Sequence, residues 1–329
     1  MKRFHKINIM FYVLFLALLA VSCVPKEESM GNAGQTFVKL FPDGYNMLAV
    51  DALTTPQTGL LFEVRRDVSN SADLNSASTV ELQYDVDGSI LKAYNDGLLA
   101  EDSTSQLYDP LPAELGTVSP AITNGKITLN FAAGETGKPI KVNLPAAANF
   151  DFSLKYALAF KIVSVSGTGK LSEGVGKTIV CEVLAKNKWD GVYTVTGSFV
   201  DYVNAAWVGY YPKTIELRTI GANACTRYDK GEATDGYIFD TDGAGSLSLF
   251  GAFTPAFTFD ASGNVGVFNT TTDSNAARNR TAVLYTGDGA INKYNADKSM
   301  DVTFQLSQLN VSPILRNLIT EHYVYKGPR

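Results

Sequence analysis

Few residues in this sequence have the types and spacing that enzyme catalysis requires. Histidine occurs only as His5 and His322. His322 alternates with Tyr323 and Tyr325, and this pattern favours a packed or rim position over the role of a general base. One histidine in the body of the chain and two widely spaced cysteines cannot supply the ligands of a histidine-rich zinc site. We therefore expect no catalytic histidine and no metal centre.

Pairs of carboxylates could act in other ways, as the acid and base of a glycosidase or as calcium ligands. Such pairs stand two residues apart, directly before a glycine, in Tyr84–Gly88 and in Phe239–Gly243. The second pair lacks the later glutamate of an EF-hand loop, and Asp-x-Asp-Gly is more typical of a hairpin turn. No glycine-rich stretch follows a phosphate-binding pattern. The sequence thus predicts a chain that is not an enzyme and binds no cofactor.

One cluster of aromatic residues has a spacing that suits ligand binding. It falls within ten residues of an expected connection between two strands and consists of Tyr202, Trp207, Tyr210 and Tyr211. Aromatic rings can stack on the C–H faces of sugars, and Asp201 and Asn204 could accept hydrogen bonds from hydroxyl groups. Binding residues commonly lie on loops at a barrel mouth. The alternative, that these rings close the barrel end or pack against the first module, stays open.

The elements that must position these residues are mostly short strands. In Lys126–Phe131 every second side chain is apolar, as a half-buried strand requires, and Asn124-Gly125 suits a tight hairpin turn before it. Many short strands separated by turns predict an immunoglobulin-like β-sandwich over residues 35–185. Ile90–Asn95 is expected to form a single helical turn. The expected strands are Gln35–Leu40, Tyr45–Ala52, Leu60–Val68, Ser78–Asp85, Gly116–Ile122, Lys126–Phe131, Pro139–Leu144, Tyr156–Val165 and Thr178–Leu184.

A second module over residues 186–329 shows the same pattern of short, turn-separated strands. Evenly spaced strands favour an antiparallel meander closed into a barrel, which leaves no exposed sheet edges. No long helix and no internal repeat is expected, and Trp189 is expected to be a structural residue at the junction of the modules. The expected strands are Tyr193–Asp201, Lys213–Ile220, Gly236–Asp240, Ser246–Phe250, Phe257–Phe259, Val265–Phe268, Ala282–Tyr285, Ile291–Tyr294, Met300–Leu309 and His322–Tyr325.

Residues 1–22 predict a secretory signal peptide. Three basic residues precede the largely apolar run Ile7–Ala20, and small residues lead up to Cys23. These are the parts of an export signal, and the run is shorter than the roughly 20 apolar residues that span a bilayer. Residues 20–23 resemble a bacterial lipobox, in which the cysteine is acylated. We expect Cys23 to anchor the chain to a membrane through lipid; an ordinary signal peptide with a chance cysteine is the alternative.

Residues 23–34 predict a flexible tether, because the segment is polar and contains proline and glycine. Lys26, Glu27 and Glu28 resemble the signal that directs lipoproteins of the phylum Bacteroidetes to the outer face of the outer membrane. We therefore expect a lipid-anchored, surface-exposed protein of the cell outer membrane. A solvated linker without any signal would look similar.

Charge and cysteine content narrow the classes of partner. The net charge is −5, and because residues 1–22 carry three positive and no negative charges, the remainder has a net charge of −8. An acidic chain without clusters of lysine and arginine argues against nucleic acid as a partner. Cys181 and Cys225 are expected in different modules, and we expect two free, mostly buried thiols, although an exported protein could contain a disulfide.

Both modules resemble known parts of Bacteroidetes surface lipoproteins. Residues 35–185 are similar to domain-of-unknown-function family 1735 in the Val86-Asp87 segment leading to Leu91 and Tyr94-Asn95, in Tyr108 and Leu111-Pro112, in the strand with Tyr156, and in the closing segment Asn187–Tyr193. The second module looks like the lipocalin-like barrel often joined to this domain, with a Gly327-Pro-Arg tail. Such lipoproteins are often encoded with glycan-uptake systems, and the same domain precedes some endo-β-N-acetylglucosaminidases. The resemblance implies glycan capture.

The sequence therefore predicts a non-catalytic, surface-anchored protein that binds glycans or assists their uptake, with a polysaccharide or host glycan as its ligand. The candidate ligand-binding residues are Tyr202, Asn204, Trp207, Tyr210 and Tyr211. Two alternatives remain open. The chain could be a structural or adhesive module that binds a protein partner at the outer membrane, or it could carry a small apolar ligand inside the barrel.

Overall fold

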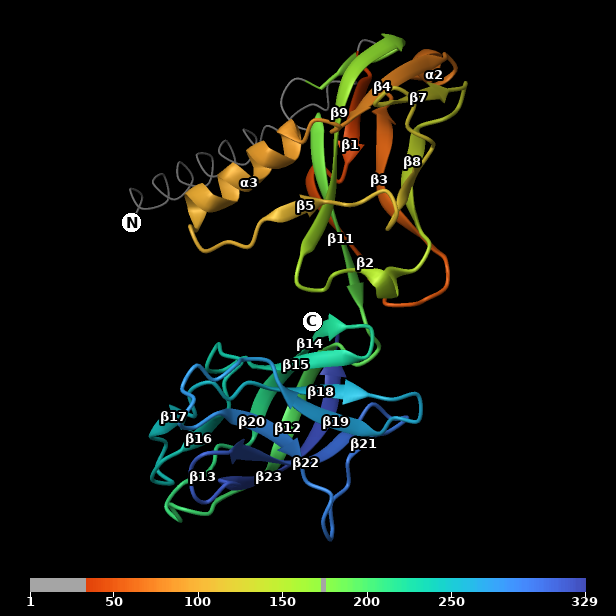
Figure 1. Cartoon of the computed structure of the whole chain (residues 1–329). Coiled ribbons are helices and arrows are strands. Elements are labelled where there is room, and N and C mark those ends of the chain that lie inside the picture. The colour runs from red at the N-terminus through yellow and green to blue at the C-terminus, as the bar shows by residue number, and fades with distance from the viewer. Residues whose placement is uncertain (1–33, 173–175) are drawn as a thin grey trace, which may run out of the picture.

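The structure, a computed structural model, describes residues 34–172 and 176–329, and it is built almost entirely from strands (Figure 1). This confirms the all-β class expected from the sequence. The expected signal peptide and most of the tether, with Cys23, Lys26, Glu27 and Glu28, lie outside the described residues. Within the described residues, no helix is long and apolar enough to cross a membrane.

The first module contains two sheets that pack face to face. One sheet has the strand order β10 (Lys170–Leu171), β1 (Phe37–Phe41), β3 (Gln57–Asp67), β8 (Gly137–Leu144) and β6 (Thr117–Ser119). The other has the order β2 (Gly44–Asp51), β11 (Thr178–Lys186), β9 (Lys155–Gly167), β4 (Ser78–Tyr84) and β7 (Lys126–Phe131), with β5 (Tyr108–Pro110) paired to β9. Alternate residues of both sheets point inward and form one apolar core, in which the rings of Phe62 and Phe160 lie 5.1 Å apart.

The helices of this module are α2 (Ser71–Leu74), α3 (Ser89–Glu101) and the 3-10 turn Ala147–Asn149. The expected single helical turn at Ile90–Asn95 is wrong in length, because α3 runs for 13 residues. The carboxylate of Asp85 accepts hydrogen bonds from the backbone N–H groups of Ile90 (3.0 Å) and Leu91 (2.8 Å) and so stabilises the start of α3. Leu91 is the buried anchor of α3 against the sandwich.

The second module is a nearly closed antiparallel barrel. Its strand order is β19 (Val265–Asn269), β18 (Pro255–Phe259), β15 (Ala224–Asp229), β14 (Lys213–Gly221), β12 (Gly191–Asp201), β23 (Asn317–Gly327), β22 (Met300–Gln308) and β20 (Arg280–Leu284), with β21 (Lys293–Tyr294) also paired to β22. The first and last strands of this order, β19 and β20, lie against each other. The sequence-based prediction of a barrel is thus confirmed.

A small three-stranded sheet stands at one end of the barrel. It has the order β13 (Val208–Gly209), β16 (Ile238–Asp240) and β17 (Leu247–Leu249), and Figure 1 shows it beside the main barrel sheet. Of the barrel strands, β13 and β15 were not predicted from the sequence, and in the first module β5 and β10 were not predicted. β15 was missed because its inward positions include Cys225, Arg227 and Asp229, so the usual apolar alternation is absent.

The modules meet at residues 187–190, since β11 ends at Lys186 and β12 begins at Gly191. Trp189 has a structural place inside the barrel, where its ring stacks on Phe259 at a centroid distance of 4.4 Å. Asp190 receives hydrogen bonds from the backbone N–H and the hydroxyl group of Thr219, both at 2.9 Å, and it pairs with Arg329 at 2.9 Å. The C-terminal residue is thereby fixed to the junction.

Both described cysteines are free and buried, as the sequence predicts. Cys181 lies in β11 within the core of the sandwich, and Cys225 lies in β15 within the core of the barrel. Each is surrounded by its own module, so a disulfide between them does not form.

Candidate functional site

The predicted aromatic cluster lies in the connection between β12 and β14, at the barrel end that carries β13. Asp201, the last residue of β12, organises this connection. Its Oδ1 atom accepts hydrogen bonds from the backbone N–H groups of Val203 (2.9 Å) and Asn204 (2.8 Å). Its Oδ2 atom pairs with Nε of Arg316 at 2.8 Å. Because the Asp201 side chain is buried, these contacts hold the start of the connection in one conformation.

Tyr202 is the exposed aromatic residue of this connection. Half of its surface (50%) remains accessible to solvent. Its backbone N–H donates a 2.9 Å hydrogen bond to the carbonyl oxygen of Arg316, and its hydroxyl oxygen lies 3.5 Å from Nε2 of Gln305. The ring is therefore held at both ends while much of its surface stays open to a ligand.

Trp207 covers the end of the barrel. Its ring centroid lies 4.7 Å from that of Phe239 and 5.8 Å from that of Phe250, and the guanidinium of Arg316 lies 5.1 Å from the ring. Such a cation over an indole face contributes about 0.5–2 kcal/mol. Trp207 is half-buried, so one part of the ring packs inward and the other remains accessible. Arg316 contacts both Trp207 and the backbone of Tyr202, and so joins the two.

Tyr211 points into the barrel. Its hydroxyl group lies 2.6 Å from that of Tyr237 and donates a 3.0 Å hydrogen bond to Oε1 of Glu321. Burial, and then the negative charge of Glu321, raise the pKa of Tyr211 well above the ordinary value. Gly209 permits this position, because a Cβ atom there would lie 2.3 Å from the Tyr211 ring. Tyr210 beside it is half-buried.

The two interpretations that the sequence left open thus apply to different members of the cluster. Tyr211 and part of Trp207 pack at the barrel end, whereas Tyr202 presents its ring to solvent. Asn204 is half-exposed, although its Oδ1 atom already accepts a 3.2 Å hydrogen bond from the N–H of Ala206. The structure therefore places Tyr202, Asn204 and the accessible part of Trp207 on one fixed connection.

Sequence reasoning missed a buried network of charged and phenolic groups inside the barrel. Glu321 accepts hydrogen bonds from Tyr211 (3.0 Å) and Tyr323 (2.6 Å), and its Oε1 atom lies 3.6 Å from Nη2 of Arg227. Lys213 is also buried and donates a 3.1 Å hydrogen bond to the carbonyl oxygen of Ile238. The signal in the sequence is the alternation of Ile319, Glu321 and Tyr323, which places Glu321 on the inward face of β23.

Aromatic rings fill the remaining interior of the barrel among the described residues. The fully buried members include Tyr193, Tyr237, Phe253, Phe257, Phe304 and Tyr323. Their edge-to-face and stacked contacts, such as that of Phe257 with Phe304 at 5.9 Å, are typical of a packed core. This packing speaks against the barrel interior as a cavity for an apolar ligand.

The two carboxylate pairs accept hydrogen bonds from nearby backbone N–H groups. Asp240 accepts hydrogen bonds from the N–H groups of Asp242, Gly243 and Gly245, between 2.8 and 3.0 Å, which forms the turn predicted there. The pair at Tyr84–Gly88 does not form a hairpin turn, because the segment leads from β4 into α3. No group of three or more histidine, cysteine or acidic residues that could hold a metal ion occurs in the part of the chain that the structure describes.

His322 lies on the outer face of the barrel. Its Nδ1 atom is 2.7 Å from Oδ1 of Asp301 on the neighbouring strand β22, and 46% of its side chain is exposed. The neighbouring Tyr323 points inward and is fully buried. The alternation seen in the sequence therefore separates the histidine from the buried network.

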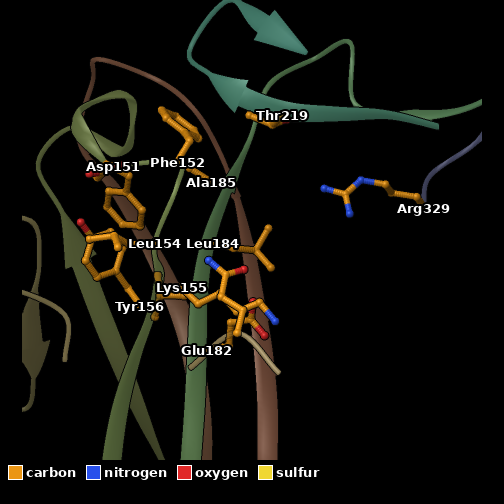
Figure 2. A pocket seen from close by; sticks show the side chains of 13 residues that line it. Asp151, Phe152, Leu154, Lys155, Tyr156, Glu182, Leu184, Ala185, Thr219 and Arg329 are labelled. Carbon is orange, nitrogen blue, oxygen red and sulfur yellow. The ribbon is translucent and has the colours of Figure 1, made fainter. Parts of the chain in front are cut away.

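A small cavity lies at the junction of the two modules (Figure 2). It has a volume of about 200 Å³, and its walls include Phe152, Lys155 and Glu182 of the sandwich and Thr219 and Arg329 of the barrel. Ligand pockets usually measure about 300–1,000 Å³. The junction cavity is smaller than this range.

The fold and these sites define a two-module β protein, a sandwich followed by a barrel. A protein-family model described as a "-like, N-terminal domain" matches residues 43–169, within the first module. No curated protein matches the sequence significantly.

Several similar solved structures come from Bacteroides. A protein of unknown function from Bacteroides ovatus shares 10% identity over 89% of this chain and 95% of its own, with a TM-score of 0.52. An auxiliary nutrient binding protein from Bacteroides thetaiotaomicron shares 14% identity over 85% of this chain and 90% of its own, with a TM-score of 0.46. A multidomain protein including DUF1735 from Bacteroides ovatus shares 13% identity over 85% and 90%, with a TM-score of 0.44. The first likeness shows that the fold is shared over most of the chain.

Proposed function

We propose that this chain is a non-catalytic, lipid-anchored protein of the outer membrane surface that binds glycans or assists their uptake. The observation that carries the proposal is the exposed ring of Tyr202, fixed on the connection between β12 and β14. Tyrosine offers a large, rigid, amphipathic surface at a low cost in conformational entropy. A ring that is already held in place loses little freedom when a sugar stacks on it.

A polar group beside Tyr202 supports sugar recognition. The half-exposed Asn204 lies on the same connection and can donate or accept hydrogen bonds, whereas Gln305 on β22 is buried and contacts only the hydroxyl group of Tyr202. The accessible part of Trp207 adds a second ring on the same connection. A ring with an amide beside it suits a pyranose, since the faces of the sugar are apolar and its rim carries hydroxyl groups.

Binding is tested by isothermal titration calorimetry and affinity electrophoresis against a panel of plant polysaccharides and host glycans. Tyr202→Ala should weaken the binding found for the wild-type protein at least tenfold, a loss of about 1.4 kcal/mol. Tyr228→Ala is the matched control, because Tyr228 is a partly exposed barrel tyrosine whose ring packs against Arg218. Unchanged affinity in Tyr202→Ala would remove the site, and a panel without any bound glycan would remove the function.

The structure refines which further substitutions test the site. Trp207→Ala should also weaken glycan binding, because it removes the accessible part of the indole and the surface on which Arg316 rests. Tyr211→Phe should leave affinity unchanged but lower stability, because it removes the hydroxyl group that donates to Glu321. A glycan affinity that falls in Tyr211→Phe at unchanged stability would contradict this division of roles.

Anchoring is a separate part of the proposal and rests on Cys23, Lys26, Glu27 and Glu28. Metabolic labelling with a palmitate analogue should mark the full chain, and Cys23→Ser should abolish the label. Protease treatment of intact cells should degrade the protein if it faces outward. Replacement of Lys26, Glu27 and Glu28 by alanine should then protect the protein without loss of the lipid. Labelled Cys23→Ser protein would rule out the anchor.

The non-catalytic part of the proposal is tested with the same ligands. Glycans that bind the wild-type protein should be recovered without shorter products after prolonged incubation. Release of reducing ends that requires Asp301 or His322, the carboxylate and imidazole paired on the outer face, would make the protein an enzyme.

A protein partner at the outer membrane is the second candidate function. Exposed apolar side chains surround the same connection, with Val200 at 50% and Val203 at 55% exposure. Apolar side chains gathered around an aromatic anchor also suit a protein interface. Recovery of one stoichiometric protein with the tagged chain from intact outer membranes, abolished by Val203→Asp and unaffected by glycan, would favour this function over glycan binding.

A further inference from the structure

A groove on the first module lies between α3 and the sheet that α3 covers. One wall is formed by Ser89, Ile90, Ala93 and Tyr94 of α3, the other by Gly44 and Tyr45 of β2, and the floor by Thr178, Val180 and Lys161. Its volume is about 660 Å³, within the range of about 300–1,000 Å³ that ligand pockets occupy. It lies on the other module from Tyr202 and is therefore a separate site.

Two parallel tyrosine rings, here called the platform, line this groove. The rings of Tyr45 and Tyr94 are parallel to within 3°, with centroids 6.1 Å apart, and both are partly exposed. Tyr108 lies behind them, 6.5 Å from Tyr45 and 5.9 Å from Tyr94. Each partly exposed ring offers an apolar surface on which a sugar face can stack.

The platform is fixed by a carboxylate behind it. Glu182 of β11 accepts hydrogen bonds from the hydroxyl groups of both Tyr45 and Tyr108, the latter at 2.9 Å. Asn95 joins α3 to β5 through two hydrogen bonds with the backbone of Tyr108, at 2.9 and 3.0 Å. Because these contacts hold the rings without any ligand, little ordering is required on binding.

The charge of the lining indicates the kind of ligand. Lys161 is the charged residue of the groove and is exposed, while the remaining lining residues are neutral. Its cross-strand neighbours, Gln83 and Thr178, carry no charge. The nearby carboxylates lie outside the lining of the groove: Asp85 and Asp87 accept hydrogen bonds from the first backbone N–H groups of α3, and Glu182 accepts them from tyrosine hydroxyl groups behind the rings. The groove therefore combines an aromatic platform with a cation that no acidic residue of the lining neutralises.

We infer that this groove binds an acidic oligosaccharide, with pyranose rings stacked on Tyr45 and Tyr94 and a uronate carboxylate paired with Lys161. The inference rests on the proposed glycan-binding function and names a second site with a preference for carboxylate-bearing sugars. Gly44 supports it, since its φ of +70° excludes most side chains and nothing lies within 4 Å of a Cβ atom there, which leaves that end of the groove open.

The test is calorimetry of the full mature chain with oligosaccharides of two kinds. The acidic probes are trigalacturonate, trimannuronate and a hyaluronan hexasaccharide, and the neutral probes are maltotriose, cellotriose and xylotriose. At least one acidic probe should bind more tightly than the neutral probes, and added sodium chloride should weaken it. Tyr94→Ala should weaken binding by about thirtyfold, and Lys161→Met should weaken the acidic probe by about fivefold without affecting a neutral one.

A further variant guards against a loss of binding through misfolding. Ala93→Trp keeps Tyr45, Tyr94 and Lys161 and fills the groove from the exposed face of α3, so it should block binding while the urea midpoint stays unchanged. Acidic probes that bind no better than neutral ones, or binding that survives Ala93→Trp and Tyr94→Ala, would overturn the inference. If the probes are instead lost only in Tyr202→Ala, the groove is excluded while the proposed function stands. If no glycan of any kind binds the wild-type chain, the proposed function fails as well.

Discussion

Arg227 and Glu321 face each other inside the barrel, with 3.6 Å between Nη2 and Oε1 and no exposed surface on either side chain. Burial alone would oppose the charged form of Arg227, but Glu321 and the nearby tyrosines raise its pKa above the ordinary value. Tyr211 and Tyr323 both donate to the same carboxylate. The connection that carries the candidate glycan site is thus tied through Tyr211 to the charged centre of the barrel.

Removal of one partner of this pair should strongly destabilise the protein. Arg227→Met leaves the buried Glu321 carboxylate without its cation, and the free energy of unfolding in urea should fall by about 3–5 kcal/mol. The double variant Arg227→Met/Glu321→Met should lose less than the two single losses combined, by about 1–3 kcal/mol, because the charges are removed together. Strictly additive losses would show that the two residues do not interact.

Lys213 gives the barrel a pH-dependent stability. Burial, and then the positive charge of Arg227, lower the pKa of Lys213 from 10.5 to about 8. Between these values the unfolded chain holds a proton that the folded chain has released, so the contribution of Lys213 to stability rises with pH. Lys213→Met should therefore be more stable than the wild-type protein at pH 7. The difference in free energy of unfolding between Lys213→Met and the wild-type protein should shrink by about 1.4 kcal/mol per pH unit above pH 8.

Comparison of Lys213→Met with the wild-type protein separates the effect of Lys213 from the effects of other titrating groups. The buried thiols and tyrosines have raised pKa values and act in the opposite direction at high pH, but they are shared by both proteins. Urea unfolding at pH 7, 8, 9 and 10 measures the difference, with the exposed Lys141→Met as control. An advantage of Lys213→Met that stays constant from pH 7 to pH 10 would show that the pKa of Lys213 is not lowered in the folded protein.

The sequence predicts those parts of the fold in which local pattern and burial agree. Lys126–Phe131 alternates strictly between exposed and buried residues, and the strand begins and ends at the predicted residues. β15 was missed because its inward side chains include Asp229 and Arg227, and the partner of Arg227, Glu321 on β23, approaches it only in the closed barrel. The predicted helix starts within one residue of α3 but ends too early, because Asp96 and Gly97 are poor helix formers, whereas α3 continues to Glu101.

The candidate sites show the same limit. The sequence places Tyr202 and Tyr211 together on one connection, but it cannot show that Tyr202 faces solvent while Tyr211 reaches Glu321. The platform of Tyr45 and Tyr94 was missed altogether, because it joins a strand to a helix distant in the sequence through packing alone. Residues that meet only through tertiary contacts leave no spacing signal in a single sequence.

The cap of α3 provides a test of how the groove is held. Asp85→Ala removes the acceptor for the backbone N–H groups of Ile90 and Leu91 and should lower the free energy of unfolding by about 1–2 kcal/mol. Asp87→Ala is the matched control, since Asp87 is exposed and accepts only the N–H of Ser89 among the first turns of α3. Its effect on stability should be much smaller. Equal losses in the two variants, measured by urea unfolding, would argue against the cap.

The two buried thiols should react only when their module opens. Burial raises the pKa of the Cys225 thiol to about 12, and burial likewise raises that of Cys181. Since the thiolate is the reactive form, a Cys23→Ser chain at pH 8 should react with Ellman's reagent at the slow rate of unfolding. It should release two equivalents of chromophore at once in denaturing urea. Cys181→Val should reduce this to one equivalent, which reports on the barrel alone.

The raised pKa values of the two thiols also affect the stability of the protein at alkaline pH. In the unfolded chain each thiol ionises near its ordinary pKa of about 8.5, whereas the folded state keeps the proton. The stabilising contribution is therefore complete below pH 8.5 and is lost as the pH rises toward 12. Cys225→Ala should flatten this alkaline loss relative to the wild-type protein, although it removes a buried side chain. A fast reaction of Cys225 with Ellman's reagent in the native protein would contradict both expectations, because an accessible thiol would ionise equally in the two states.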